Sequence, residues 1–109
     1  MAEIKYMSDG DLITDFDELP KCLAFECEAE VIDVESISNG VVICLEKYYF
    51  LRQSHAALTV IVENTTECSK AAIIASGGGD GIFNINYGVH EEFATSAANA
   101  LGVHYGLHL

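Results

Sequence analysis

Three β-rich segments follow one another in the middle of the chain, and their connections are short enough for hairpins. The segments are residues 41–50, 57–63 and 69–75, joined by residues 51–55 and 64–67. A parallel crossover between strands needs a dozen or more residues, so connections of this length predict antiparallel pairing of successive strands. This stretch therefore predicts an antiparallel meander.

A further strand is predicted ahead of the meander. From Phe25 to Val31, apolar and acidic residues alternate, which is typical of a strand with one face in water. Residues 32–35 shift the phase of this alternation, which indicates a β-bulge. Asn39-Gly40 is a common turn pair and would connect this strand to the meander.

Helical periodicity is found on both sides of these strands. The first helix is expected to start at the capping residues 8–11 and to end, kink or restart at Pro20. The second is expected over the alanine-rich residues 91–101, with Gly102 as its stop. The apolar positions of the first helix, three or four residues apart, are Leu12, Phe16, Leu19 and Leu23.

The last expected strand lies at residues 82–87, closed by Gly88, and the tail after the second helix is expected to fray. The predicted order is helix, four or five strands, helix, in one domain spanning residues 1–109. Two helices bury their apolar stripes together when both cover the same face of a sheet. The fold class expected is therefore α+β: a two-layer sandwich of an antiparallel four- or five-stranded meander with two helices on one face.

The chain is strongly acidic, with 17 Asp and Glu against 5 Lys and Arg and a net charge of −12. A nucleic-acid interface needs clustered basic residues, and an anionic membrane attracts basic segments, so neither partner is expected. The acidic residues concentrate in residues 1–35, which predicts a negative field at one face or end of the fold. No signal peptide or membrane-spanning run is visible, so a cytoplasmic location is expected.

The four cysteines are expected to remain structural thiols, because their spacing contains no CxxC pair of the kind that zinc ribbons and redox sites use. They are Cys22, Cys27, Cys44 and Cys68. No cofactor and no metal site is assigned.

The glycine-rich stretch of the chain is Ser76-Gly77-Gly78-Gly79-Asp80. Consecutive backbone N–H groups can cradle an anion, so these five residues are the candidate ligand-binding loop. A P-loop, however, ends in Gly-Lys-Ser/Thr before a helix, whereas this stretch precedes a predicted strand and carries a carboxylate. A structural connection is therefore favoured, and Ser76 lacks the surroundings of a catalytic nucleophile, so no catalytic residue is assigned.

The segment Glu46–Arg52 carries aromatic residues on both faces of one predicted strand. Tyr48 and Phe50 would share one face, with Lys47 and Tyr49 on the other. A two-layer domain buries one of these faces, so some aromatic surface is expected to stay exposed, either as an interface or as rings whose hydroxyls reach water. Tyr48, Tyr49 and Phe50 are therefore the candidate interface residues.

The sequence contains EKYY at residues 46–49, ALTV at residues 57–60 and SGGGDGIF at residues 76–83. Together these segments resemble a family of small uncharacterised bacterial proteins, mainly from Gram-positive anaerobes. Ala57 stands where a serine is expected in that family. The resemblance implies a bacterial cytosolic domain of unknown function and transfers no catalytic residue.

The favoured hypothesis is a non-enzymatic domain that associates with itself, as a homo-oligomer such as a dimer, or with another partner through the aromatic strand. The alternative is a small-molecule binding or catalytic pocket between sheet and helices, with the glycine-rich loop at its mouth. A weaker third interpretation is metal capture by His104, His108 and nearby acids, against which a solvated tail is preferred.

Overall fold

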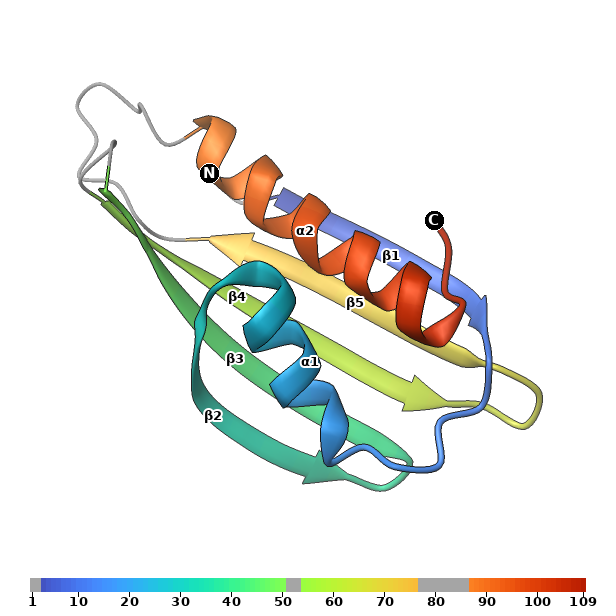
Figure 1. Cartoon of the computed structure of the whole chain (residues 1–109). Helices are drawn as coiled ribbons and strands as arrows, with labels where there is room; N and C mark the ends of the chain where they lie inside the picture. Colours follow the sequence, from blue (N-terminus) through green and yellow to red (C-terminus); the bar gives the residue numbers. More distant parts are fainter. Residues whose placement is uncertain (1–2, 51–53, 77–86) are drawn as a thin grey trace.

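The chain folds into a five-stranded antiparallel sheet with two helices on one face (Figure 1). The computed structural model describes residues 3–50, 54–76 and 87–109. This architecture confirms the predicted fold class. The elements in chain order are β1 (Glu3–Gly10), α1 (Glu18–Cys27), β2 (Glu30–Ile37), β3 (Gly40–Tyr49), β4 (Ser54–Asn64), β5 (Ser69–Ser76) and α2 (Tyr87–Tyr105).

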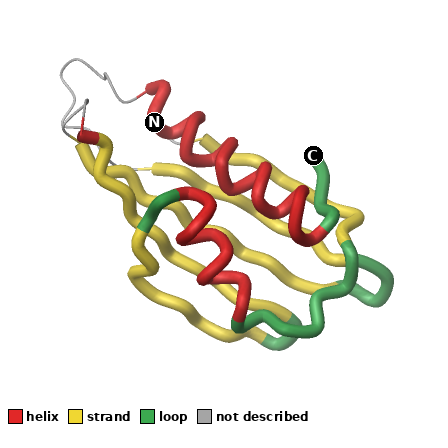
Figure 2. Tube along the Cα trace, viewed as in Figure 1, coloured by secondary structure: helices red, strands yellow, loops and turns green. Residues whose placement is uncertain are grey.

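The strands lie in the order β1-β5-β4-β3-β2, so the predicted meander is present from β2 to β5 and is visible as the run of neighbouring strands in Figure 2. The predicted bulge is confirmed, because Val31 pairs with Leu45 and Asp33 with Cys44, which leaves Ile32 as the extra residue. The N-terminal strand β1 was not predicted. It pairs with β5 at the far edge of the sheet.

The fifth strand expected at residues 82–87 is not confirmed. Tyr87 is the first residue of α2, and residues 77–86 lie outside the described part of the chain. The fifth position in the sheet belongs to β1 instead.

Helix α1 begins later and ends later than predicted. It starts at Glu18, so residues 8–11 belong to the end of β1 and the following loop, and Leu12 is exposed. Pro20 lies in the first turn, where its missing N–H has no partner within the helix, so it neither ends nor kinks α1. The strand predicted from Phe25 is wrong for its first residues, because α1 continues to Cys27.

Burial explains this continuation of α1. Leu19, Leu23 and Cys27 are four residues apart and all buried, so they form one helical stripe on the core.

The end of α1 has an uncommon residue in its left-handed position. Glu28 has φ 54° and ψ 49°, and its N–H donates to the carbonyl of Phe25 at 3.2 Å, while the N–H of Ala29 donates to Ala24 at 2.9 Å. These two bonds form a Schellman motif, in which glycine is the usual residue because it has no Cβ. Glu28 also places a carboxylate at the negative end of the helix dipole.

Replacing Glu28 with glycine is therefore expected to raise the free energy of unfolding by about 0.5–1 kcal/mol, the relief of left-handed strain less the added freedom of the unfolded chain. Urea denaturation measures this change. The matched control is Lys21→Gly, at an exposed position inside the same helix, which should lower stability by about 1 kcal/mol. Equal losses in the two variants would contradict the assignment.

Helix α2 runs past Gly102, which was expected to stop it, and includes Gly88, which was expected to close a preceding strand. Gly88 and Gly102 lie inside it, and it ends before Gly106, whose φ of 74° and N–H bond to the carbonyl of Gly102 form a left-handed cap. A Cβ on Gly102 would lie 3.2 Å from the carbonyl oxygen of Leu107, so the close return of the tail favours glycine there.

The tail after α2 is docked, contrary to the expected fraying. Leu107 is buried, and His108 exchanges two backbone hydrogen bonds with Ser8 of β1, at 2.9 and 3.2 Å. The core lies between this helix layer and one face of the sheet, with α2 over β1 and β5 and α1 beside α2 (Figure 1).

Candidate functional site

The sheet face opposite the helices carries no other element of the described chain, and we call it the open face (Figure 1). Side chains alternate between the two faces, so the partners of buried residues identify the helix side and the remaining residues the open face. The centre of the open face consists of Ile4 and Tyr6 from β1, Ala72 and Ile74 from β5, Thr59 and Ile61 from β4, and Val42 and Cys44 from β3.

The strand register arranges these central residues in two rows across the sheet. One row is Tyr6, Ala72, Ile61 and Val42, and the next is Ile4, Ile74, Thr59 and Cys44. Tyr6 is 73% exposed and Ile4 is 51% exposed, while the other six residues are half-buried. Beyond them, Glu63 of β4 pairs with Lys70 of β5, so a carboxylate and an ammonium group lie side by side at one end of the strands.

The edge of the open face formed by β2 is acidic. By register, β2 places Glu30 beside Glu46, Asp33 beside Cys44 and Glu35 beside Val42. All eight residues of β2 are exposed. The open face therefore combines an apolar centre with a strongly negative border along β2.

The candidate aromatic residues divide between the two faces as their alternation predicts. Tyr48 lies on the open face, 47% exposed, and its ring contacts that of His55 at 4.8 Å between centroids. Phe50, just after β3, is 78% exposed. His55 belongs to β4 rather than to the predicted hairpin loop, and its Nδ1 lies 3.7 Å from the carboxylate of Glu46.

Tyr49 points to the helix side. Its ring meets the buried ring of Phe93 edge-on at 6.2 Å, and the Lys47 ammonium lies 4.9 Å from the centre of the Tyr49 ring. Burial, reinforced by Glu92 and then by Cys27, raises the pKa of Tyr49 to about 12. Lys47 also donates a hydrogen bond to the carbonyl of Cys27 at 2.9 Å, at the end of α1. Lys47 and Tyr49 thus hold α1 and α2 on the sheet. Of the two tyrosines, Tyr48 is the one that a partner can reach.

The candidate ligand-binding loop is placed only at its first residue. Ser76 ends β5 and is half-buried beside Ala57. Gly77, Gly78, Gly79 and Asp80 lie outside the described residues.

The two C-terminal histidines face different acids. His104, in α2, lies 3.8 Å from Glu26 of α1, whereas His108, in the tail, lies 4.0 Å from Asp9. In the described ranges, no group of three or more His, Cys, Asp or Glu side chains is placed to hold a metal ion. Nor does any described helix combine the length and hydropathy needed to cross a bilayer.

All four cysteines are free thiols, as predicted. Burial, opposed in part by Lys47, raises the pKa of Cys27 to about 11. Burial and the nearby Glu26 also raise the pKa of Cys22, which lines a groove of about 450 Å³ between α1 and α2 together with Phe25 and His104. A protonated thiol is a weak nucleophile, so this groove lacks the activated cysteine that its residue types suggest.

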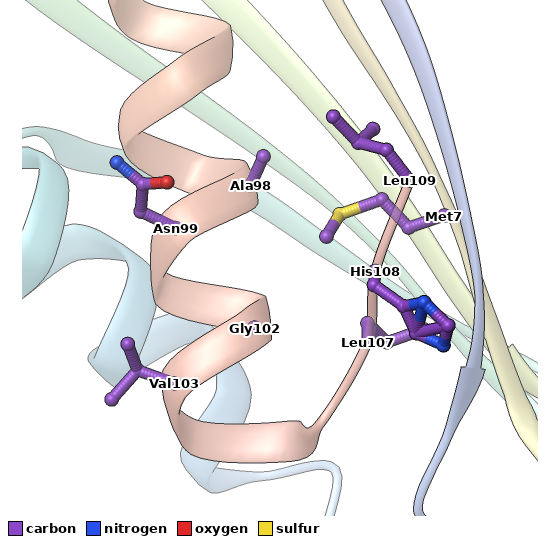
Figure 3. A pocket seen from close by; sticks show the side chains of 8 residues that line it. All are labelled: Met7, Ala98, Asn99, Gly102, Val103, Leu107, His108 and Leu109. Atoms are coloured by element: carbon purple, nitrogen blue, oxygen red, sulfur yellow. The ribbon is translucent and has the colours of Figure 1, made fainter.

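A second groove, of about 400 Å³, lies between α2 and the C-terminal tail (Figure 3). Apolar side chains dominate its wall, among them Met7, Val103 and Leu109, and His108 stands at its rim. Asn99 is the other polar residue of this wall.

Sequence reasoning missed the most exposed apolar part of the open face, which is Ile4 and Tyr6 of β1. The available signal was the alternation of these two residues with Glu3 and Lys5. Glu3 and Lys5 point to the helix side, where their side chains form an ion pair at 3.6 Å.

Comparison with known proteins supplies a family. A family model described as "Family of unknown function (DUF6054)" matches residues 21–104, which span most of α1, the meander and nearly all of α2. No curated protein and no solved structure matches the chain. The matched region covers well over half of the chain, and the chain is therefore a member of the DUF6054 family, whose function is unknown.

Proposed function

We propose that this chain is a protein-interaction domain whose contact surface is the open face. The observation that carries the proposal is the exposure of Tyr6, Ile4 and Tyr48 on a sheet face that neither described helix covers. Large side chains of this kind release water when a partner covers them, and contiguous apolar patches on soluble proteins often mark interaction sites.

Two properties of the open face favour a protein partner over a small ligand. Its apolar residues spread over four strands, and a hollow among them, lined by Tyr6, Ile61 and Ala72 among others, measures only about 210 Å³. Aromatic residues are enriched at protein interfaces, while charged residues gather at the rim, which matches an apolar surface that includes Tyr6 and is bordered by acids along β2.

Photo-crosslinking tests the proposal directly. Benzoylphenylalanine in place of Tyr6 is expected to give protein adducts on irradiation of cells that express the chain. The control position is Phe25, which is 80% exposed on α1 and therefore equally accessible but on the opposite side of the molecule. Adducts at neither position, or equal adducts at both, would contradict an interface on the open face.

Tyr48 is the position for a mutational version of this test. Tyr48→Glu should reduce the adducts formed from position 6 if the partner extends along β3, and it should leave the fold intact, since Tyr48 is exposed. The same change at Tyr49 would place a carboxylate near Phe93 and Glu92 and would report on folding instead.

A further inference from the structure

We propose that the partner on the open face is a second copy of the chain, related by a two-fold axis that runs parallel to the strands between β4 and β5. This inference rests on the proposed function, because it names the occupant of the same surface. Aligned packing of two sheets at roughly 30°, about 10 Å apart, is a common arrangement in β-sandwiches.

The strand register makes the open face complementary to itself about this axis. The axis places β4 of one copy over β5 of the other and β3 over β1, so each row of side chains meets the same row of its partner. Ile61 then faces Ala72, and Thr59 faces Ile74, each in both directions. A larger side chain meets a smaller one at both positions, most clearly where Ile61 meets Ala72, as interdigitated packing requires.

The shape of the open face agrees with this pairing. The hollow of about 210 Å³ is lined by Tyr6, Ile61 and Ala72, together with Glu63 and Lys70, and Ala72 is its smallest side chain on the open face. In the proposed dimer the hollow receives Ile61 of the second copy.

Charge complementarity points to the same axis. Among the described residues Lys70 forms no ion pair, and neither does its neighbour Glu63. The axis brings Glu63 of each copy opposite Lys70 of the other, because these residues share a row. The angle between the sheets offsets the two copies sideways toward the ends of the strands, and the side chains of Glu63 and Lys70 are long enough to follow this offset.

The net charge of −12 selects against the competing arrangements. The axis along the strands leaves the two acidic β2 strands on opposite sides of the dimer, five strand spacings or about 24 Å apart. This distance exceeds the screening length of about 8 Å, so the two β2 strands repel each other little. A two-fold axis across the strands would lay β2 on β2. Pairing of two β2 edges would bring the acids Glu30, Asp33 and Glu35 of one copy against those of the other, and at the β1 edge His108 already bridges to Ser8.

Charge exchange at the Glu63–Lys70 row tests the proposal. Sedimentation velocity of the purified, untagged chain should show a dimer that Tyr6→Glu weakens more than a hundredfold, and that Glu63→Lys and Lys70→Glu each weaken about tenfold. Net charge alone would move these last two variants in opposite directions. The control Lys21→Glu, which changes charge equally on exposed α1, should leave the dimer unchanged.

Mixing the two charge variants isolates the contact between copies. The two lysines of one variant then face the two glutamates of the other, while the row within each chain stays repulsive. Native mass spectrometry with one variant labelled with ¹⁵N should show the mixed dimer in excess over both homodimers. A purely statistical mixture would overturn the proposed axis.

Two further outcomes separate this inference from the proposed function. A monomeric purified chain whose position 6 still crosslinks to a different protein in cells would overturn self-association and leave the interaction surface standing. A dimer that Tyr6→Glu does not weaken would overturn both. Far-ultraviolet circular dichroism of each variant confirms that the fold is retained.

Discussion

Replacing Phe93 with alanine is expected to lower the free energy of unfolding by about 4 kcal/mol. Phe93 is fully buried where α2 meets the sheet, and its ring packs edge-on against Tyr49 of β3. Removing such a ring loses its transfer free energy and leaves a cavity. For a domain of this size the melting temperature should fall by roughly 20 °C.

Thermal and urea unfolding measure this loss, at a protein concentration where both variants have the same oligomeric state. The control is Thr95→Ala, at an exposed position on the same helix, which should change stability by less than about 0.5 kcal/mol. Similar losses in the two variants would mean that α2 does not close the core through Phe93.

The parts of the fold that the sequence predicts are those where burial and local periodicity agree. Strands β3, β4 and β5 each alternate buried residues with half-buried or exposed ones on a half-covered sheet, and their short connections leave antiparallel pairing as the remaining choice. The bulge at Ile32 was visible as a phase shift for the same reason.

The ends of the helices were mispredicted because the local sequence pattern at each of these positions is compatible with two structures. Asp9 and Gly10 resemble a helix cap, yet Asp9 has φ 59° and the pair forms the irregular end of β1. The alternation that begins at Phe25 resembles a strand, yet Cys27 completes a buried helical stripe. In both cases tertiary packing, which periodicity does not encode, decided between the alternatives.

The candidate site was predictable in part. Alternation along β3 correctly divided Tyr48 from Tyr49, because the side chains of a strand alternate whatever covers them. This alternation could not show which of the two faces of the sheet the helices would cover. The most exposed part of the apolar surface on the open face lies on β1, so it depends on the pairing of Ile4 with Ile74, which is 70 positions later in the sequence.

Replacing Gly40 with alanine is expected to lower the free energy of unfolding by about 3 kcal/mol, near the upper end for overpacking. A Cβ at this position would lie 2.0 Å from the carbonyl oxygen of Val62 and 2.7 Å from the Cα of Glu63. Both are backbone atoms of β4, so no side-chain rotation relieves the overlap. Gly40 is also the first residue of β3 and pairs with both Ile37 and Glu63.

Urea denaturation of Gly106→Ala provides the comparison, because that glycine has a left-handed φ but no backbone atom of another strand so near. Its loss should be about 1 kcal/mol. A loss for Gly40→Ala no greater than this would show that β3 and β4 separate easily at this end. The packing at Gly40 also affects the open face, because the close contact there fixes the register that puts Val42 beside Ile61. A slip by one residue would exchange the two faces of β3 and bring buried side chains onto the interaction surface.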